Sequence, residues 1–241
     1  MAFNLKHVIA TLRLQKDVAT GYSFPREGVV ASAVIEAGVE KVRPSLAAGS
    51  EVVVGFVVSD SDSRTDAVLV ETITVPASPY AVQLKKTILV GAAGSVECGV
   101  REGATPYTQV ANTGAINSAT KFFVDPATGL ATFHSGALGK VLTVSYRYQL
   151  TALEKTNLDY ARSPSNTAGA TLGTVTVVAG SGEIYTQEFD ASQNWAAASP
   201  TITTGANGEI TIGGAGTTIA GVRIIKLPDV DDPSLGLAFN F

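Results

Sequence analysis

KFFVDPATGLATFHSGALGKVLTVSYRYQL (Lys121 to Leu150) carries the clearest secondary-structure signal in the chain. Asp125, Pro126 and Gly129 are turn residues, because an Asp side chain accepts from turn amides, Pro presets φ and Gly tolerates positive φ. From Val141 onward the odd positions are mostly polar, whereas the even positions are Leu142, Val144, Tyr146, Tyr148 and Leu150. This period of two predicts a half-buried antiparallel strand.

Other short apolar runs, separated by Gly, Pro and Asn, extend the same pattern along the chain. Strand signals recur at intervals of about ten residues between residues 67 and 150, a rhythm typical of sandwich and barrel domains. EVVVGFVV (Glu51 to Val58) is apolar on both faces, so we expect a strand buried on both sides or lying against another subunit. Ala206-Asn207-Gly208 predicts a hairpin turn. The fold class is therefore all-β, with two antiparallel β-sandwich or β-barrel domains, one of them compatible with an Ig-like module, and little helix.

Breaks in the pattern suggest where the domains divide. The breaks near Val75 and Thr151 predict one antiparallel β domain over residues 76–152, with an N-terminal β region over 1–75 that pairs with a C-terminal β region over 163–241. Thr151-Ala-Leu-Glu154 has the form of a capping box, which predicts a short helix to about Tyr160. SPSNTAGA (residues 163–170) has a linker composition, so 153–170 is expected to be a short helix and linker. Strand signals leave open whether the domains are nested or sequential.

Charge and composition exclude several classes of partner. The chain of 241 residues has a formal net charge of −4, and Arg223 and Lys226 are the two basic residues after residue 162. Nucleic-acid binding needs clustered Lys and Arg, so we expect no nucleic-acid partner. No window reaches the roughly 20 apolar residues of a membrane span, and Lys6 and Arg13 interrupt the N-terminal run, so we expect synthesis in a host cytoplasm and no membrane partner.

The residues that usually carry chemistry are sparse. The single cysteine, Cys98, excludes an internal disulfide and is expected to be a buried apolar filler. Two histidines, His7 and His134, are too few and too far apart for a typical catalytic metal site. The acidic clusters Asp60-Ser61-Asp62 and Asp229-Val230-Asp231-Asp232 have oxygen ligands for Ca²⁺ but do not match an EF-hand loop, so a solvated loop is the preferred interpretation.

Three glycine-containing motifs also fall short of a site. G-x-S-x-G does not occur, Gly139-Lys140 lacks the other residues of a phosphate loop, and Gly213-Gly214-Ala215-Gly216 lacks a dinucleotide fingerprint. A pair of carboxylates for glycoside hydrolysis stays open, because their separation exists only in the fold. We therefore predict no catalytic residue, no cofactor and no metal ion.

Five segments together resemble tailed-bacteriophage structural cement or capsid decoration proteins. They are TGYSFPREGVVASAVIEAG (Thr20 to Gly38), RPSLAAGSEVVVGFVVSD (Arg43 to Asp60), VETITVPASPYAVQLKKT (Val70 to Thr87), VDPATGLATFHSGALGKVLTVSYRYQLT (Val124 to Thr151) and GVRIIKLPDVDDPSLGLAFNF (Gly221 to Phe241). The resemblance implies a non-enzymatic virion protein, a homotrimer that binds the major capsid protein on the outer capsid surface and stabilises capsomer contacts. The stretch around residues 121–150 is also similar to β modules of other phage structural proteins.

A static interface of this kind draws most of its stability from buried apolar and aromatic contacts. The interface candidates are Phe56, Tyr146, Trp195, Leu237, Phe239 and Phe241. We expect the apolar residues at the C-terminus to be buried, either in a core or on a neighbouring subunit. Two alternative functions are a tail-tube or baseplate component, which would form stacked rings, and a carbohydrate-binding virion module, which would need aromatic platforms in a groove although Trp195 is the only tryptophan.

Overall fold

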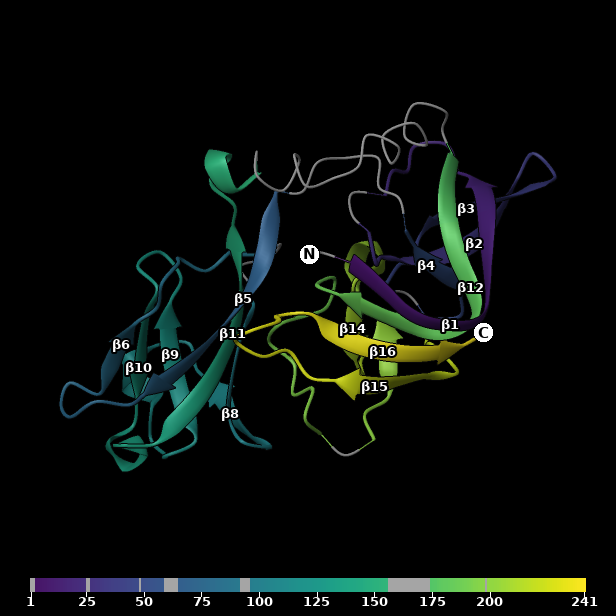
Figure 1. The fold of residues 1–241 in the computed structure, drawn as a ribbon. Coiled ribbons are helices and arrows are strands. Elements are labelled where there is room, and N and C mark those ends of the chain that lie inside the picture. The colour runs from purple at the N-terminus through teal and green to yellow at the C-terminus, as the bar shows by residue number, and fades with distance from the viewer. Residues whose placement is uncertain are drawn as a thin grey trace.

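Strands make up most of the regular secondary structure of the described residues, so the all-β class that the alternating pattern predicted is confirmed. The computed structural model describes residues 3–24, 27–47, 49–58, 65–91, 96–155, 174–197 and 199–241. Within these ranges the strands form two seven-stranded sheets and one two-stranded sheet. The two large sheets belong to two units that lie side by side (Figure 1). The purple N-terminal strands and the yellow C-terminal strands belong to the same unit (Figure 1).

The first unit contains strands from both ends of the chain. Its large sheet has the order β15-β16-β12-β4-β2-β3, and β1 also pairs with β12. The strands are β1 (Phe3–Asp17), β2 (Val30–Glu36), β3 (Val39–Pro44), β4 (Val53–Val57), β12 (Thr174–Thr186), β15 (Val222–Lys226) and β16 (Leu235–Asn240). All of these pairings are antiparallel. The small sheet of β13 (Ile202–Thr204) and β14 (Ile210–Ile212) packs against it, and the expected turn at Asn207 joins its two strands through a 3-10 turn (η5, Ala206–Gly208).

The second unit comes from the middle of the chain. Its sheet has the order β5-β11-β7-β8-β9-β10-β6. The strands are β5 (Asp66–Thr74), β6 (Ala81–Gln83), β7 (Cys98–Glu102), β8 (Thr105–Gln109), β9 (Lys121–Asp125), β10 (Leu130–Phe133) and β11 (Val141–Gln149). Two 3-10 turns, η2 (Thr113–Ala115) and η3 (Ser135–Ala137), lie in its connections. This sheet was expected to be antiparallel throughout, but β8 and β9 run parallel to each other.

The domain boundary expected at Val75 is wrong. β5 pairs with β11 over its whole length, from Asp66 opposite Gln149 to Thr74 opposite Val141. Val75 itself is buried in the second unit, and the prolines after it mark a turn within that unit. The second unit is also nested in the first, because β4 and β12 flank it in the sequence yet are neighbours in one sheet, with Val57 opposite Val177.

The stretch from residue 121 to 150 forms the expected succession of strands and turns. In the turn between β9 and β10, Asp125 Oδ1 accepts from the Ala127 amide at 3.0 Å, and Gly129 has φ +72°. On β11, Leu142, Val144 and Tyr146 are fully buried, as the even positions predicted. Arg147 departs from the pattern, because this odd-numbered, charged residue is only 2% exposed.

Three groups of buried side chains hold the units together. The main core fills the first unit around Phe56, Ile184 and Phe189, and a smaller core lies on the other side of β4 around Val57. The burial of β4 on both faces is therefore confirmed. A third core fills the second unit, but Val68 and Val70 of β5 belong to the main core, so β5 contributes to both units.

The segment after the second unit begins as predicted. Thr151 and Glu154 form the capping box: the Thr151 amide donates to Glu154 Oε2 at 2.9 Å and the Glu154 amide donates to Thr151 Oγ1 at 3.3 Å. Residues 152–155 are helical. The rest of the predicted helix and the linker at 163–170 lie outside the described residues. Within the described ranges, no helix is long and apolar enough to cross a membrane.

Candidate functional site: a buried arginine between the two units

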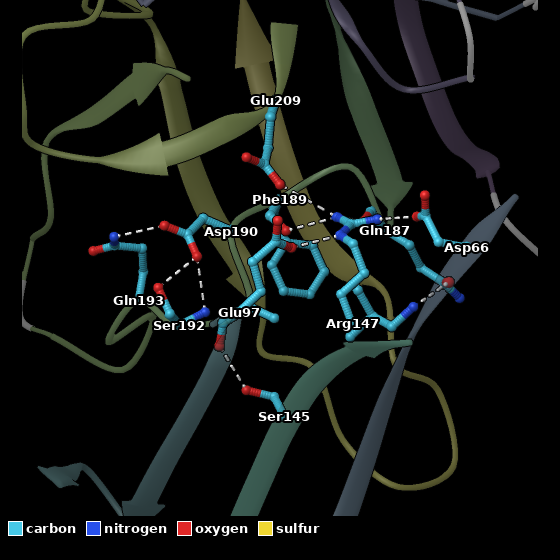
Figure 2. Close-up of polar contacts among 12 residues, drawn as sticks. Asp66, Glu97, Ser145, Arg147, Gln187, Phe189, Asp190, Ser192, Gln193 and Glu209 are labelled. Atoms are coloured by element: carbon cyan, nitrogen blue, oxygen red, sulfur yellow. Dashed lines mark hydrogen bonds and ion pairs between the residues drawn. The ribbon is translucent and has the colours of Figure 1, made fainter. Parts of the chain in front are cut away.

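Arg147 is the centre of a polar network that joins the two units. Its Nη1 donates to Asp66 Oδ1 at 2.8 Å, and its Nε donates to Glu97 Oε2 at 2.8 Å. Its Nη2 lies 2.9 Å from the carbonyl oxygen of Gln187 and 3.0 Å from that of Phe189. Figure 2 shows the guanidinium between these groups, with Glu209 Oε1 3.3 Å from Nη2. All three nitrogens of Arg147 therefore have partners.

The partners of Arg147 come from both units. Asp66 begins β5 and Glu97 precedes β7 in the second unit, whereas Gln187 and Phe189 follow β12 in the first. A guanidinium can serve these groups together because its donors are arranged in a rigid planar fork, which a lysine ammonium lacks. We call Arg147 and its five partners the arginine joint: Asp66, Glu97, Gln187, Phe189 and Glu209.

Further contacts reinforce the arginine joint on both sides. The Ser145 hydroxyl donates to the Ala191 carbonyl at 3.0 Å, and the Val68 amide donates to Gln187 Oε1 at 3.3 Å. Gly99 lets the chain at Ala191 approach this closely, since a Cβ at residue 99 would lie 2.5 Å from the Ala191 carbonyl oxygen. The two units are thus connected by hydrogen bonds as well as by the shared strand β5.

The arginine joint contains more acidic than basic groups, and its pKa values reflect this. Burial alone would lower the pKa of Arg147, but the carboxylates of Glu188 and Asp66, followed by Glu209 and Glu97, raise it overall. Arg147 is therefore permanently charged. Burial raises the pKa of Glu209 to about 8, against the opposing attraction of Arg147, and the neighbouring carboxylate of Glu97 adds to the rise. Glu209 therefore changes its charge near neutral pH.

The raised pKa of Glu209 predicts a pH-dependent stability. Between its ordinary pKa of 4.5 and the folded-state value of about 8, Glu209 binds more protons in the folded protein than in the unfolded chain. Its contribution to stability is therefore complete below pH 4.5 and is lost as the pH rises towards 8. In Glu209→Gln, the decline in the free energy of unfolding between pH 5 and pH 8.5 should shrink by roughly 2 kcal/mol, as measured by urea denaturation.

Glu40→Gln is the matched control for this experiment. Glu40 makes an exposed ion pair with Lys16, and its side chain is 49% exposed. This substitution should leave the shape of the pH profile unchanged, because exposed pairs contribute little to stability. A Glu209→Gln profile parallel to that of the wild type would contradict the assigned titration.

Five of the six interface candidates lie inside the protein's own cores, so the expectation that they face a partner is wrong for these five. Phe56 and Leu237 are fully buried, and Phe239 is 3% exposed. Tyr146 is fully buried in the second unit, where its hydroxyl donates to Glu71. Trp195 is 5% exposed and packs edge-on against Phe189. Large aromatic side chains contribute much of the buried area both in protein cores and in protein-protein interfaces. Their presence in a sequence therefore does not show which of the two they form.

The C-terminal residue Phe241 is the exception. It is 37% exposed, and its ring lies 5.4 Å from the rings of both Phe56 and Phe239. Leu235, Leu237 and Phe239 are buried in the main core, so the apolar C-terminus is a core strand whose last ring remains accessible.

Other residues considered for chemistry have structural surroundings. Cys98 is buried, which confirms its expected place as a filler of the core, and burial raises the pKa of its thiol to about 12. His134 Nδ1 accepts from the Gly136 amide at 3.0 Å and caps a 3-10 turn. In the second acidic cluster, Asp229 Oδ1 accepts from the amides of Asp231 and Asp232. The Asp60 cluster lies outside the described residues, as does the side chain of His7.

Two cavities lie near Trp195. One, of about 50 Å³, lies between the units and is lined by Arg101, Tyr107, Ser145 and Asn194 among others. The other is an open groove of about 540 Å³ along β15. Within the described residues, no three His, Cys, Asp or Glu side chains converge as metal ligands would.

The sequence did not reveal the arginine joint. Arg147 occupies a position of the polar face of β11, where an exposed arginine is expected, and its acidic partners are scattered through the sequence. A weak signal exists in retrospect, because Arg147 lies between Tyr146 and Tyr148 in a strand with few charges. Comparison with known proteins adds no further guide: no family model, no curated protein and no solved structure matches the chain.

Proposed function

We propose that this chain is a non-enzymatic virion protein that binds the outer surface of a phage capsid and stabilises contacts between capsomers. The observation that carries the proposal is the resemblance of five segments, spread over most of the chain, to phage cement and decoration proteins. The proposed partners are the major capsid protein and further copies of the chain in a homotrimer.

The arginine joint supports a clamping role. A protein that binds two neighbouring capsomers at once must hold its two contact surfaces at a fixed distance, because each flexible connection lowers the effective concentration of the second contact. Arg147, Ser145 and Val68 provide bonds between the units, and β5 belongs to both cores. A stiff two-unit β protein is suited to this task.

The hairpin of β2 and β3 supplies the candidate contact surface. It extends beyond the body of the first unit (Figure 1), and its turn at Ala37 and Gly38 is tight, with positive φ at both residues. Ile35 and Val39 on this hairpin, and Val52 beside it, are 68%, 53% and 70% exposed. Val39 faces the other side of the hairpin from Ile35, because Ile35 lies opposite Glu40 and Val39 lies opposite Glu36. Exposed apolar side chains such as those of Ile35 and Val52 often mark a protein-protein contact.

The test is to add the purified protein to capsids that lack decoration. We expect saturable binding on the outer surface and a higher temperature of capsid disruption. The double variant Ile35→Asp, Val52→Asp should bind at least about tenfold more weakly while its own melting temperature stays close to that of the wild type, because both side chains already face solvent.

A matched control places the same charge on another exposed apolar residue. Leu153 is 71% exposed, so Leu153→Asp should leave binding within about twofold of the wild type. Absence of binding by the wild-type protein would refute the capsid-decoration proposal. Stacked rings of the purified protein in negative-stain micrographs would instead favour a tail-tube component.

A further inference from the structure

The edge of the first sheet at β15 combines an unpaired strand with an open groove. Among the strands that the structure describes, β15 pairs with β16 and has no neighbour on its other side. A groove of about 540 Å³ borders β15, lined by the segment from Trp195 to Pro200 and by Val222, Arg223, Ile224 and Leu227. Its volume lies within the usual range of ligand-binding clefts.

The register of β15 shows which backbone groups face the groove. Arg223 lies opposite Ala238 of β16, and the neighbouring Asn240 amide donates to the Gly221 carbonyl at 2.9 Å. In an antiparallel ladder, successive residues direct their amide and carbonyl groups to opposite sides. Arg223 therefore bonds to β16, while the amide and carbonyl groups of Val222 and Ile224 point towards the free side. A bulge after Ile224 ends the regular stretch.

The side chains of β15 alternate in a way that selects a partner. Val222 and Ile224 pack against the main core, and both also line the groove. The Arg223 side chain alternates to the other face of the strand and is exposed, although Arg223 also borders the groove, and no carboxylate of the described residues pairs with it. Lys226, by contrast, is already neutralised, with its Nζ 3.2 Å from Asp229 Oδ2 and 3.7 Å from Asp232 Oδ2. Arg223 is thus the cation that remains available at this edge.

We propose that β15 is a docking edge for an extended acidic segment of a partner protein, which adds to the sheet as a further strand. Its main chain bonds to Val222 and Ile224, its apolar side chains enter the groove beside Trp195, and a carboxylate lies next to Arg223. Main-chain bonds of this kind supply affinity, and alternate side chains supply specificity. The proposal is independent of capsid binding.

Charge distinguishes this partner from a second copy of the chain. In a two-fold pairing of β15 with itself, each strand would bring the cation of Arg223 and no acidic residue of its own to the new ladder. Like charges at neighbouring positions of a ladder are destabilising, whereas an acidic side chain on the partner strand gains a favourable cross-strand pair. An acidic partner segment therefore fits the edge better than another β15.

The probe for the test is the fluorescein-labelled peptide TVTVEVTVT, acetylated and amidated, in which valines share one face and the glutamate lies on the other. We expect saturable binding to the full-length protein in fluorescence anisotropy, with a Kd of about 0.1 mM or tighter, as for small transient contacts. The peptide TVTVKVTVT should bind at least about tenfold more weakly, because its lysine meets Arg223. A version N-methylated at alternate residues should not bind, since it cannot form the ladder.

Two variants and one control examine the same edge on the protein. Arg223→Glu should weaken TVTVEVTVT binding at least about tenfold and favour TVTVKVTVT, whereas Arg13→Glu, an equal charge change at another exposed arginine, should stay within about twofold. Ile224→Pro should abolish binding by removing an amide that faces the groove. Circular dichroism and the Trp195 fluorescence report whether each variant remains folded.

Several results would overturn the proposal. They are failure of the wild-type protein to bind TVTVEVTVT at millimolar concentration, equal binding by Arg223→Glu, and equal binding of the N-methylated peptide. Self-association of the wild type that Arg223→Glu and Ile224→Pro disrupt, without peptide binding, would assign the edge to a second copy instead. Because Arg223→Glu and the N-methylated peptide leave β15 intact, the test stands even if Ile224→Pro fails to fold.

Discussion

Arg147→Met should lower the free energy of unfolding by about 3–5 kcal/mol, the usual cost of removing one partner from a buried ion pair. Methionine replaces the apolar stem of arginine but not its guanidinium, so most of the loss comes from the polar groups that the guanidinium served. Without the guanidinium, the buried carboxylate of Asp66 and the half-buried carboxylate of Glu97 lose this cation, and the carbonyl oxygens of Gln187 and Phe189 lose a donor. The measurement is urea denaturation followed by circular dichroism and by the fluorescence of Trp195.

Arg13→Met is the matched control, because Arg13 is exposed on β1. It should change the stability by less than about 0.5 kcal/mol. The stability loss in Arg147→Lys should lie between those of Arg147→Met and Arg13→Met. Lysine retains the positive charge but cannot donate to Asp66 and both carbonyl groups together. A loss below about 1 kcal/mol in Arg147→Met would show that the arginine joint does not stabilise the connection between the units.

Phe56→Ala is expected to cost about 3–5 kcal/mol of stability, the range for removing a buried phenylalanine ring from a core. Phe56 is fully buried on β4, and its ring lies 5.4 Å from the ring of Phe239. The variant leaves a cavity in the main core, which the surrounding strands fill only in part because their hydrogen bonds fix their spacing. Thermal and urea denaturation measure the loss.

Phe241→Ala provides the comparison, because Phe241 contacts the same ring of Phe56 from the surface and is 37% exposed. Its removal should cost roughly 1 kcal/mol, since much of the ring never leaves water. Equal losses in the two variants would mean that Phe56 is less enclosed than its burial indicates. If Phe241→Ala alone weakened binding to a partner, Phe241 would be the interface residue among the six candidates.

The pattern of β11 illustrates what can be predicted from sequence. Leu142, Val144 and Tyr146 alternate with polar residues, and a strand that is half buried must have this period. The turn at Asp125 and the capping box at Thr151 are equally local, because their hydrogen bonds join residues two to three positions apart. Such features depend on residues close in the sequence, so they can be predicted without knowledge of the fold.

The same reasoning fails where two distant segments meet. Phe56, Tyr146 and Trp195 are of residue types that are common in interfaces, yet each packs in a core of its own chain. The break in the strand pattern near Val75 predicts a boundary there, whereas the pairing of β5 with β11 decides where the second unit begins. Strand pairing between segments far apart in sequence depends on which edges meet in space, and apolar patterning leaves that choice open.

The sequence by itself determined the all-β class, the alternation of β11, the turns that bound it and the two-sided burial of β4. Only the tertiary structure decided that the second unit is nested in the first, that Arg147 is buried between the two, and that β15 borders a groove. The physical reason is range: backbone preferences and the period of two act within a few residues, whereas burial of a charge depends on carboxylates and carbonyl groups that the fold brings from distant strands.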